Sequence, residues 1–213
     1  MSRNIHHLPD PIVAESIFQY LDEDSFKNLR STSTRFHEMK AHINKITYKQ
    51  YLLYKNYLDP KKITHFNCSD EDISKIPNFP NLTHLDCSGC EKISKIPNFK
   101  KLEILHCNSS INISSIPNFP KLIYLNCGNC DISKIPNLPN LEELHCSETG
   151  IKELVGLKKL EDLYCPSCEE LRSIKNLPKL IYLDCRDCTE LYELSNLPKL
   201  KECHGCEELD LDY

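Results

Sequence analysis

Short segments of alternating apolar and polar residues recur along most of this chain. In one of them, Leu85 and Cys87 alternate with His84, Asp86 and Ser88. A period of two is typical of a strand with one buried face. The same pattern returns every 19 or 20 residues, centred on Cys68, Cys87, Cys107, Cys127, Cys146, Cys165 and Cys185. A sustained period of this length predicts stacked units, none of which can bury its own apolar face alone.

The repeat frame defines a large C-terminal domain over residues 63–213. Its general form is L-x-x-L-x-C-x-x-[C/S/T/E], followed by I/L-x-x-I/L-P-N-[F/L] in the first four copies. A partial eighth unit begins at Leu200. The seven full units begin at Ile63, Leu82, Leu102, Leu122, Leu141, Leu160 and Leu180.

The dozen residues after each strand must return the chain to the next strand. They carry proline twice in most units, which argues against an α-helix and favours extended or polyproline-II turns. One slot in this segment holds only asparagine or glycine, the residues that best tolerate a positive φ. We therefore predict a left-handed turn residue at Asn78, Asn98, Asn118, Asn137, Gly156, Asn176 and Asn196.

Over residues 63–206 this frame resembles the leucine-rich repeat, L-x-x-L-x-L-x-x-[N/C]-x-L, with cysteine in place of the third apolar residue. The short period and the Pro-x-[Phe/Leu]-Pro segment are similar to the shortest members of that family. The resemblance implies an α/β repeat fold, with parallel strands on a concave face and mostly non-helical convex segments.

The N-terminal segment has a different pattern, with apolar residues at helical spacing from Ile12 to Leu21. Its order of Leu-Pro, Ile-Phe, Tyr-Leu-Asp and a later Leu-Arg resembles an F-box. The resemblance implies a small helical domain over residues 1–46, followed by a helical linker or cap over residues 47–62. It also implies that a Skp-type adaptor binds Leu8, Pro9, Ile12, Ile17, Phe18, Leu21 and Leu29.

Composition restricts the compartment and the partners. The formal net charge of −5 argues against a general nucleic-acid binder. The first ten residues lack an apolar core, and no apolar run approaches the length of a membrane span, so we expect neither a signal peptide nor a membrane anchor. The odd number of cysteines, 13, favours a reducing compartment, the cytoplasm or the nucleus, of a host cell if the protein is viral.

Two roles for the cysteines are compatible with their spacing. Cys165, Cys168, Cys185 and Cys188 match a zinc-binding pattern of two Cys-x2-Cys pairs. However, the first cysteine of each pair fills the inward strand position in every unit, including units that lack the second cysteine. We therefore expect buried thiols that serve as small apolar side chains, with no metal and no cofactor.

The outward strand positions carry the candidate binding residues. Alternation places histidines and cysteines on opposite sides of the strands, so we expect no Cys–His nucleophile and no enzymatic activity. Residues 139–213 hold 9 basic and 17 acidic residues. This excess favours a basic partner segment, or it is only a solvated edge. The predicted partner-binding residues of the concave face are His65, His84, Asp86, His106, Tyr124, His145, Tyr164, Tyr182 and Asp184.

Together the two resemblances imply a substrate receptor of an SCF-type cullin–RING ubiquitin ligase. The F-box would bind the adaptor, and the repeats would hold an unidentified target protein near the catalytic subunits. The alternative is a stand-alone protein-interaction scaffold whose N-terminal helices only cap the solenoid.

Overall fold

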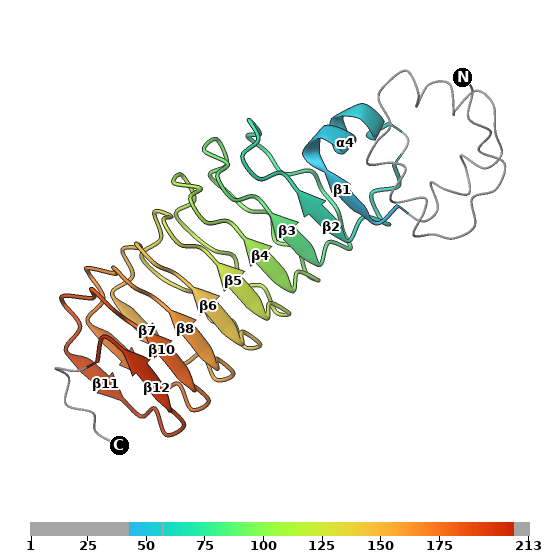
Figure 1. The fold of residues 1–213 in the computed structure, drawn as a ribbon. Coiled ribbons are helices and arrows are strands. Elements are labelled where there is room, and N and C mark those ends of the chain that lie inside the picture. Colours follow the sequence, from blue (N-terminus) through green and yellow to red (C-terminus); the bar gives the residue numbers. More distant parts are fainter. Residues whose placement is uncertain (1–42, 57, 207–213) are drawn as a thin grey trace, which may run out of the picture.

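The computed structural model describes residues 43–56 and 58–206, which form a parallel β-solenoid. Each turn contributes one three-residue strand to a nine-stranded sheet that runs the length of the described chain (Figure 1). The strands of this sheet are, in spatial order, β1 (Lys45–Thr47), β2 (His65–Asn67), β3 (His84–Asp86), β4 (Ile104–His106), β5 (Tyr124–Asn126), β6 (Glu143–His145), β8 (Asp162–Tyr164), β10 (Tyr182–Asp184) and β12 (Glu202–His204).

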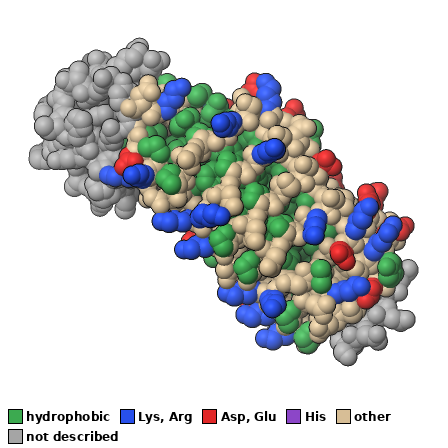
Figure 2. Space-filling model, turned by 180° about the vertical axis from the view of Figure 1, so that it is seen from behind, with side chains coloured by type: hydrophobic (Ala, Val, Ile, Leu, Met, Phe, Trp, Pro, Cys, Tyr) green, Lys and Arg blue, Asp and Glu red, His purple; other side chains and the backbone are tan. Residues whose placement is uncertain are grey.

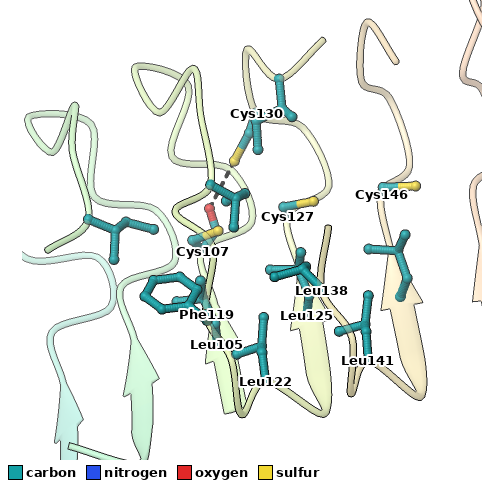
Figure 3. Packing of buried hydrophobic residues seen from close by; sticks show 14 of the residues in the cluster. Leu105, Cys107, Phe119, Leu122, Leu125, Cys127, Cys130, Leu138, Leu141 and Cys146 are labelled. Atoms are coloured by element: carbon teal, nitrogen blue, oxygen red, sulfur yellow. Dashed lines mark hydrogen bonds between the residues drawn. The ribbon is translucent and has the colours of Figure 1, made fainter. Parts of the chain in front are cut away.

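The register of the sheet is constant, and each strand pairs with the next at the equivalent residue. The middle residue of each strand is therefore stacked on the middle residue before it, as with Leu105 on Leu85 and Leu125 on Leu105. The middle residues from β1 to β10 and the first cysteine of each turn from Cys68 to Cys185 are buried, whereas Cys203 in β12 is half-buried. Figure 3 shows how they pack against apolar residues of the return segments, among them Phe119 and Leu138. Burial of each such leucine contributes about 1.5–3 kcal/mol to the free energy of folding. The stability of the core is therefore the sum of similar contributions from successive turns.

The return segments are of two kinds, and proline separates them. Three late turns form a second parallel sheet from β7 (Glu153–Val155), β9 (Ser173–Lys175) and β11 (Glu193–Ser195). The last residue of each of these strands occupies the slot that holds Pro77, Pro97, Pro117 or Pro136 in the early turns. Because proline has no N–H to donate to a sheet ladder, the early return segments remain irregular.

The prediction that the Asn or Gly slot has a positive φ is confirmed only in these late turns. Gly156, Asn176 and Asn196 have φ values of 75°, 55° and 55° and directly follow the strands of the second sheet. The prediction is wrong for Asn78, Asn98, Asn118 and Asn137, which do not have a positive φ. In early and late turns alike, another left-handed residue lies two positions after the first cysteine. These residues are Asp70, Gly89, Ser109, Asn129, Glu148, Ser167 and Asp187.

The predicted α/β leucine-rich-repeat class is wrong. Leucine-rich-repeat solenoids are helix-rich, whereas the described part of this chain has one helix, the seven-residue α4 (Tyr48–Tyr54). The return segments are too short and too rich in proline to form helices. The helical linker or cap predicted over residues 47–62 is shorter than expected, because α4 ends at Tyr54. The F-box-like helical domain was predicted on residues that lie almost entirely outside the described ones, and none of it is seen among residues 43–46.

Helix α4 covers the first turns of the solenoid. Thr47 and Gln50 form a capping box, in which the Thr47 hydroxyl accepts from the Gln50 N–H and the Gln50 side chain accepts from the Thr47 N–H. Tyr54 is buried, and the Tyr51 ring packs edge-on against Phe66, with centroids 6.1 Å apart. The helix therefore shields the apolar end of the column from water.

A second slot in each turn satisfies buried backbone carbonyls. The Cys90, Cys130, Cys168 and Cys188 thiols each donate to the carbonyl of the first cysteine in the preceding turn, over 2.8–3.1 Å. The Cys130 bond is the dashed line in Figure 3. Ser110 occupies the same slot, donating to the Cys87 carbonyl at 2.7 Å and accepting from the Cys90 N–H at 3.1 Å. Small donors are required here because an unpaired buried carbonyl is costly.

This slot gives a stability prediction. We expect Ser110→Ala to lower the free energy of unfolding by about 1–3 kcal/mol, since it leaves the Cys87 carbonyl and the Cys90 N–H unpaired. Ser110→Cys, which restores the donor found in neighbouring turns, is expected to recover most of that loss. Urea unfolding followed by circular dichroism measures both variants. Equal stability of the alanine and cysteine variants would contradict the donor role.

Candidate partner-binding face

The outer face of the nine-stranded sheet carries two rows of side chains. The first residues of the strands form one row, the third residues form the other, and the middle residues point into the core. In-register parallel strands are about 4.8 Å apart, so side chains in one row are within contact distance of their neighbours. The sequence therefore determines which chemical groups lie side by side along the face.

Six aromatic rings form a continuous series on this face. The rings belong to successive strands, from β4 to β12, and each contacts the next with centroids 4.3–5.6 Å apart. His145 and Tyr164 stack at 4.3 Å with an interplanar angle of 9°. We call this series the aromatic ladder: His106, Tyr124, His145, Tyr164, Tyr182 and His204. These rings are partly exposed, so the ladder offers both stacking surface and polar atoms to a partner.

A histidine pair lies near the N-terminal end of the same face. The rings of His65 and His84 stack with centroids 3.9 Å apart, and their Nδ1 atoms are 2.9 and 2.8 Å from the hydroxyls of Thr64 and Thr83. Partial burial, the His84 ring and Lys45 lower the pKa of His65 to about 4. Burial also lowers the pKa of His84. The stacked pair is therefore neutral at pH 7.

The histidine pair borders a groove between helix α4 and the sheet. The groove has a volume of about 770 Å³ and is lined by residues of β1 to β4 and α4, including Leu53, Tyr54 and His106. Leu53 is exposed, so the groove has an apolar wall as well as a histidine-lined floor. The groove adjoins the start of the aromatic ladder at His106, so the two features form one surface.

The two predicted aspartates are held by intramolecular hydrogen bonds that reduce their availability to a partner. Asp184 is buried, and its carboxylate accepts two hydrogen bonds from the Arg186 guanidinium, at 2.8 and 2.7 Å. This arginine lowers the pKa of Asp184. Asp86 accepts from the Ser88 N–H and from the Asn67 side chain. Both aspartates thus close the turn after their strand, in the manner of Asx turns.

Acidic side chains replace the aromatic ones at some positions in the C-terminal half. Glu143, Asp162 and Glu202 belong to the first row, between and beyond Tyr124 and Tyr182. The pKa of Asp162 is raised by partial burial and by the neighbouring carboxylates Glu143 and Glu161. Burial makes the largest contribution to this rise in pKa, and repulsion between the carboxylates adds to it. Glu143 and Glu202 each contact a ladder histidine, His145 at 2.7 Å and His204 at 2.9 Å.

The structure brings the predicted histidines and tyrosines together and adds residues that the sequence reasoning missed. His204 escaped notice because Cys203 occupies the middle strand position that holds leucine in the preceding strands from β3 to β10. His204 lies 20 residues, or one repeat period, after Asp184, and this spacing could have predicted that it belongs to the third residues of the strands. The predicted adaptor-binding residues, from Leu8 to Leu29, lie outside the described residues.

The opposite face of the molecule differs in character. Figure 2 shows it with lysine and arginine side chains along the edges and over the face, acidic side chains along one edge, and apolar side chains gathered over the N-terminal half. None of the described histidines is visible on it. The imidazoles are thus concentrated on the sheet face that carries the ladder.

The cysteines lie on the inner side of the same sheet. Burial raises the pKa of the Cys68, Cys87 and Cys127 thiols, which keeps them protonated. Cys168 and Cys188, two members of the predicted zinc pattern, donate to backbone carbonyls rather than converging with Cys165 and Cys185 on one point.

No protein-family model matches the chain, and no curated protein matches it. The parallel β-solenoid and its repeats are thus established from the structure, without support for either family resemblance. The described residues include no helix whose length and apolar character would allow it to cross a bilayer.

The histidine pair gives a pH prediction. A folded-state pKa below the unfolded value means that the unfolded chain binds more protons, so the pair lowers stability as the pH falls from about 6.5 towards 4. We expect the melting temperature to fall between pH 7 and pH 5. The fall should be smaller for a His65→Gln, His84→Gln variant. Asn67→Ala, on the same strand as His65, should retain the wild-type pH dependence. A double variant with an unchanged fall would contradict the assignment.

Proposed function

We propose that this protein is a recognition module that binds a protein partner along the outer face of its nine-stranded sheet. The observation that carries the proposal is the aromatic ladder, in which six partly exposed rings lie in contact on successive strands. Tyrosine is enriched among residues that dominate binding energy, because it combines a large rigid contact area with a hydroxyl group. Extended surfaces on repeat solenoids typically serve binding.

The charge of the face favours a basic partner segment. The carboxylate of Glu143 borders Tyr124 and that of Asp162 borders Tyr182, and the pKa of Asp162 is raised by partial burial and by repulsion from its acidic neighbours. A lysine or arginine of the partner would relieve this repulsion and could stack on an adjacent ring. The partner proposed here is therefore an extended segment rich in lysine or arginine and containing apolar residues.

A selection from a displayed random-peptide library on the immobilised full chain tests this proposal. We expect enriched peptides to be basic, and Tyr164→Ser, Tyr182→Ser to weaken their binding at least about tenfold, as loss of a hot spot does. Binding should also weaken as NaCl is raised, because the charges face solvent.

Tyr192→Ser provides the matched control. Tyr192 is 71% exposed and directly precedes β11 of the second sheet, so its loss should leave binding unchanged. Circular dichroism and melting of all variants verify the fold. Retained binding by the double variant, or an equal loss in the control, would contradict recognition by the ladder.

A second proposal specifies the biological setting. The ordered motifs Leu8-Pro9, Ile17-Phe18 and Tyr20-Leu21-Asp22 favour binding of a Skp-type adaptor by the N-terminal segment. In that case the chain is a substrate receptor of a cullin–RING ubiquitin ligase, and the ladder binds the protein to be ubiquitinated. All chemistry would then belong to other subunits, and this chain would act by proximity.

Adaptor binding is tested by a pull-down of purified full chain with a Skp-type adaptor. We expect the wild type to bind and Phe18→Asp, Leu21→Asp to fail, because the charges would enter an apolar contact. Tyr164→Ser, Tyr182→Ser should bind the adaptor normally. If the wild type fails to bind, the ligase proposal is wrong, whereas the recognition proposal depends only on the peptide experiment.

A further inference from the structure

The last turn of the solenoid departs from the repeat at consecutive positions. Cys203 occupies the middle strand position where Leu183 and Leu163 fill the core of the preceding turns. Gly205 takes the place after the strand where Cys185 stands one turn earlier, and Cys206 follows it. A smaller residue in the leucine position gives up apolar packing, so this departure calls for another source of stability.

These departures bring three sulfur atoms together. The Sγ atoms of Cys185 and Cys206 are 3.6 Å apart, and the Sγ atoms of Cys185, Cys203 and Cys206 all lie within 4.8 Å of one another. Within residues 43–56 and 58–206, this is the only group of three potential metal ligands that converges so closely. Cys185 and Cys206 are buried and Cys203 is half-buried, so the group lies at the margin of the core.

The backbone of the last turn holds the sulfurs in place. Gly205 has a φ of 85°, and a Cβ atom at this position would lie 2.6 Å from the backbone nitrogen of Arg186. Only glycine fits this close approach, which lays the Cys203–Cys206 loop against the turn that carries Cys185. The Cys185 N–H also donates to the His204 carbonyl at 2.8 Å, which ties the two turns together.

We propose that the thiolates of Cys185, Cys203 and Cys206 bind one zinc ion. Zinc–sulfur bonds of about 2.3 Å place the sulfurs of a tetrahedral site about 3.8 Å apart, close to the Cys185–Cys206 separation. Three protein ligands leave the fourth position to water. The ion would stabilise the last described turn, since within the described residues β12 pairs with a strand on one side only.

Disulfide formation is the competing use of these sulfurs. Cys203 and Cys206 are paired as a disulfide in the structure, with Cα atoms 5.9 Å apart. This pairing joins two of the three sulfurs, while the Cys185 thiol beside them donates to the His204 and Gly205 carbonyls at 3.4 and 3.6 Å. Zinc binding uses all three and requires the reduced pair, so the two states exclude each other.

Zinc analysis of the full chain, purified and kept under a phosphine reductant, decides between them. We expect about one zinc per chain in the wild type, and less than about a tenth of that in Cys203→Ser and in Cys206→Ser. Cys188→Ser is the matched control. Cys188 shares a Cys-x2-Cys pair with Cys185 but donates to the Cys165 carbonyl, a task that Ser110 performs in its own turn. This variant should keep its zinc.

Cobalt replacement keeps the proposal testable if a variant folds poorly. Wild-type protein loaded with Co²⁺ should show thiolate-to-cobalt charge-transfer absorption and the visible bands of a tetrahedral site. A chelator should lower the melting temperature of the wild type and of Cys188→Ser. A wild type without zinc and without these bands, or zinc that persists in Cys203→Ser and Cys206→Ser, would overturn the proposal in favour of a disulfide or a metal site elsewhere.

Discussion

Every turn of this solenoid must return the chain to a strand in exact register with the strand before it. The constraint arises because three residues per strand are too few to form a stable element alone, so the backbone ladder and the buried middle residue must both be supplied by the neighbouring turn. A shift of one residue would expose Leu105 and bury His106. The fixed register in turn aligns the cysteine column, the carbonyls that need donors and the outward rows.

The sequence predicted the parts of the fold that depend on this register. Alternation placed Leu85 and Cys87 inward and His84 outward, and the repeat spacing predicted parallel stacking. It could not predict the class, because a leucine-rich repeat and a plain β-solenoid share the same strand pattern and differ only in the return segment. There the short, proline-rich return segments leave no room for helices. The loss of one proline, at Val155, Lys175 and Ser195, decides only where the second sheet forms, and its meaning is clear only once that sheet is known.

For the candidate site, the sequence likewise predicted which residues face outward but not which contacts they make. Row membership of the tyrosines and histidines follows from periodicity alone, whereas the availability of a side chain depends on its local partners. Asp184 shows the difference, because Arg186 two residues later engages its carboxylate. His204 shows the opposite case, because it belongs to the ladder although Cys203 beside it breaks the repeat pattern. Such local hydrogen bonds are set by rotamers that a repeat pattern does not specify.

The departures from the repeat contain more functional information than the repeat itself. Positions that keep the frame, such as Leu125 or Cys127, are explained by packing. A change from the frame must be stabilised locally, and its physical reason is often visible: Ser110 replaces a thiol donor with a hydroxyl donor, and the loss of proline at Lys175 permits a strand. Packing does not explain Cys203 in the same way, because it puts a smaller, half-buried side chain in the position that leucine fills in the preceding turns. A ligand for its sulfur and for the two sulfurs beside it supplies the missing stabilisation, which is why the terminal turn, rather than the cysteine-rich middle, is where metal chemistry fits this fold.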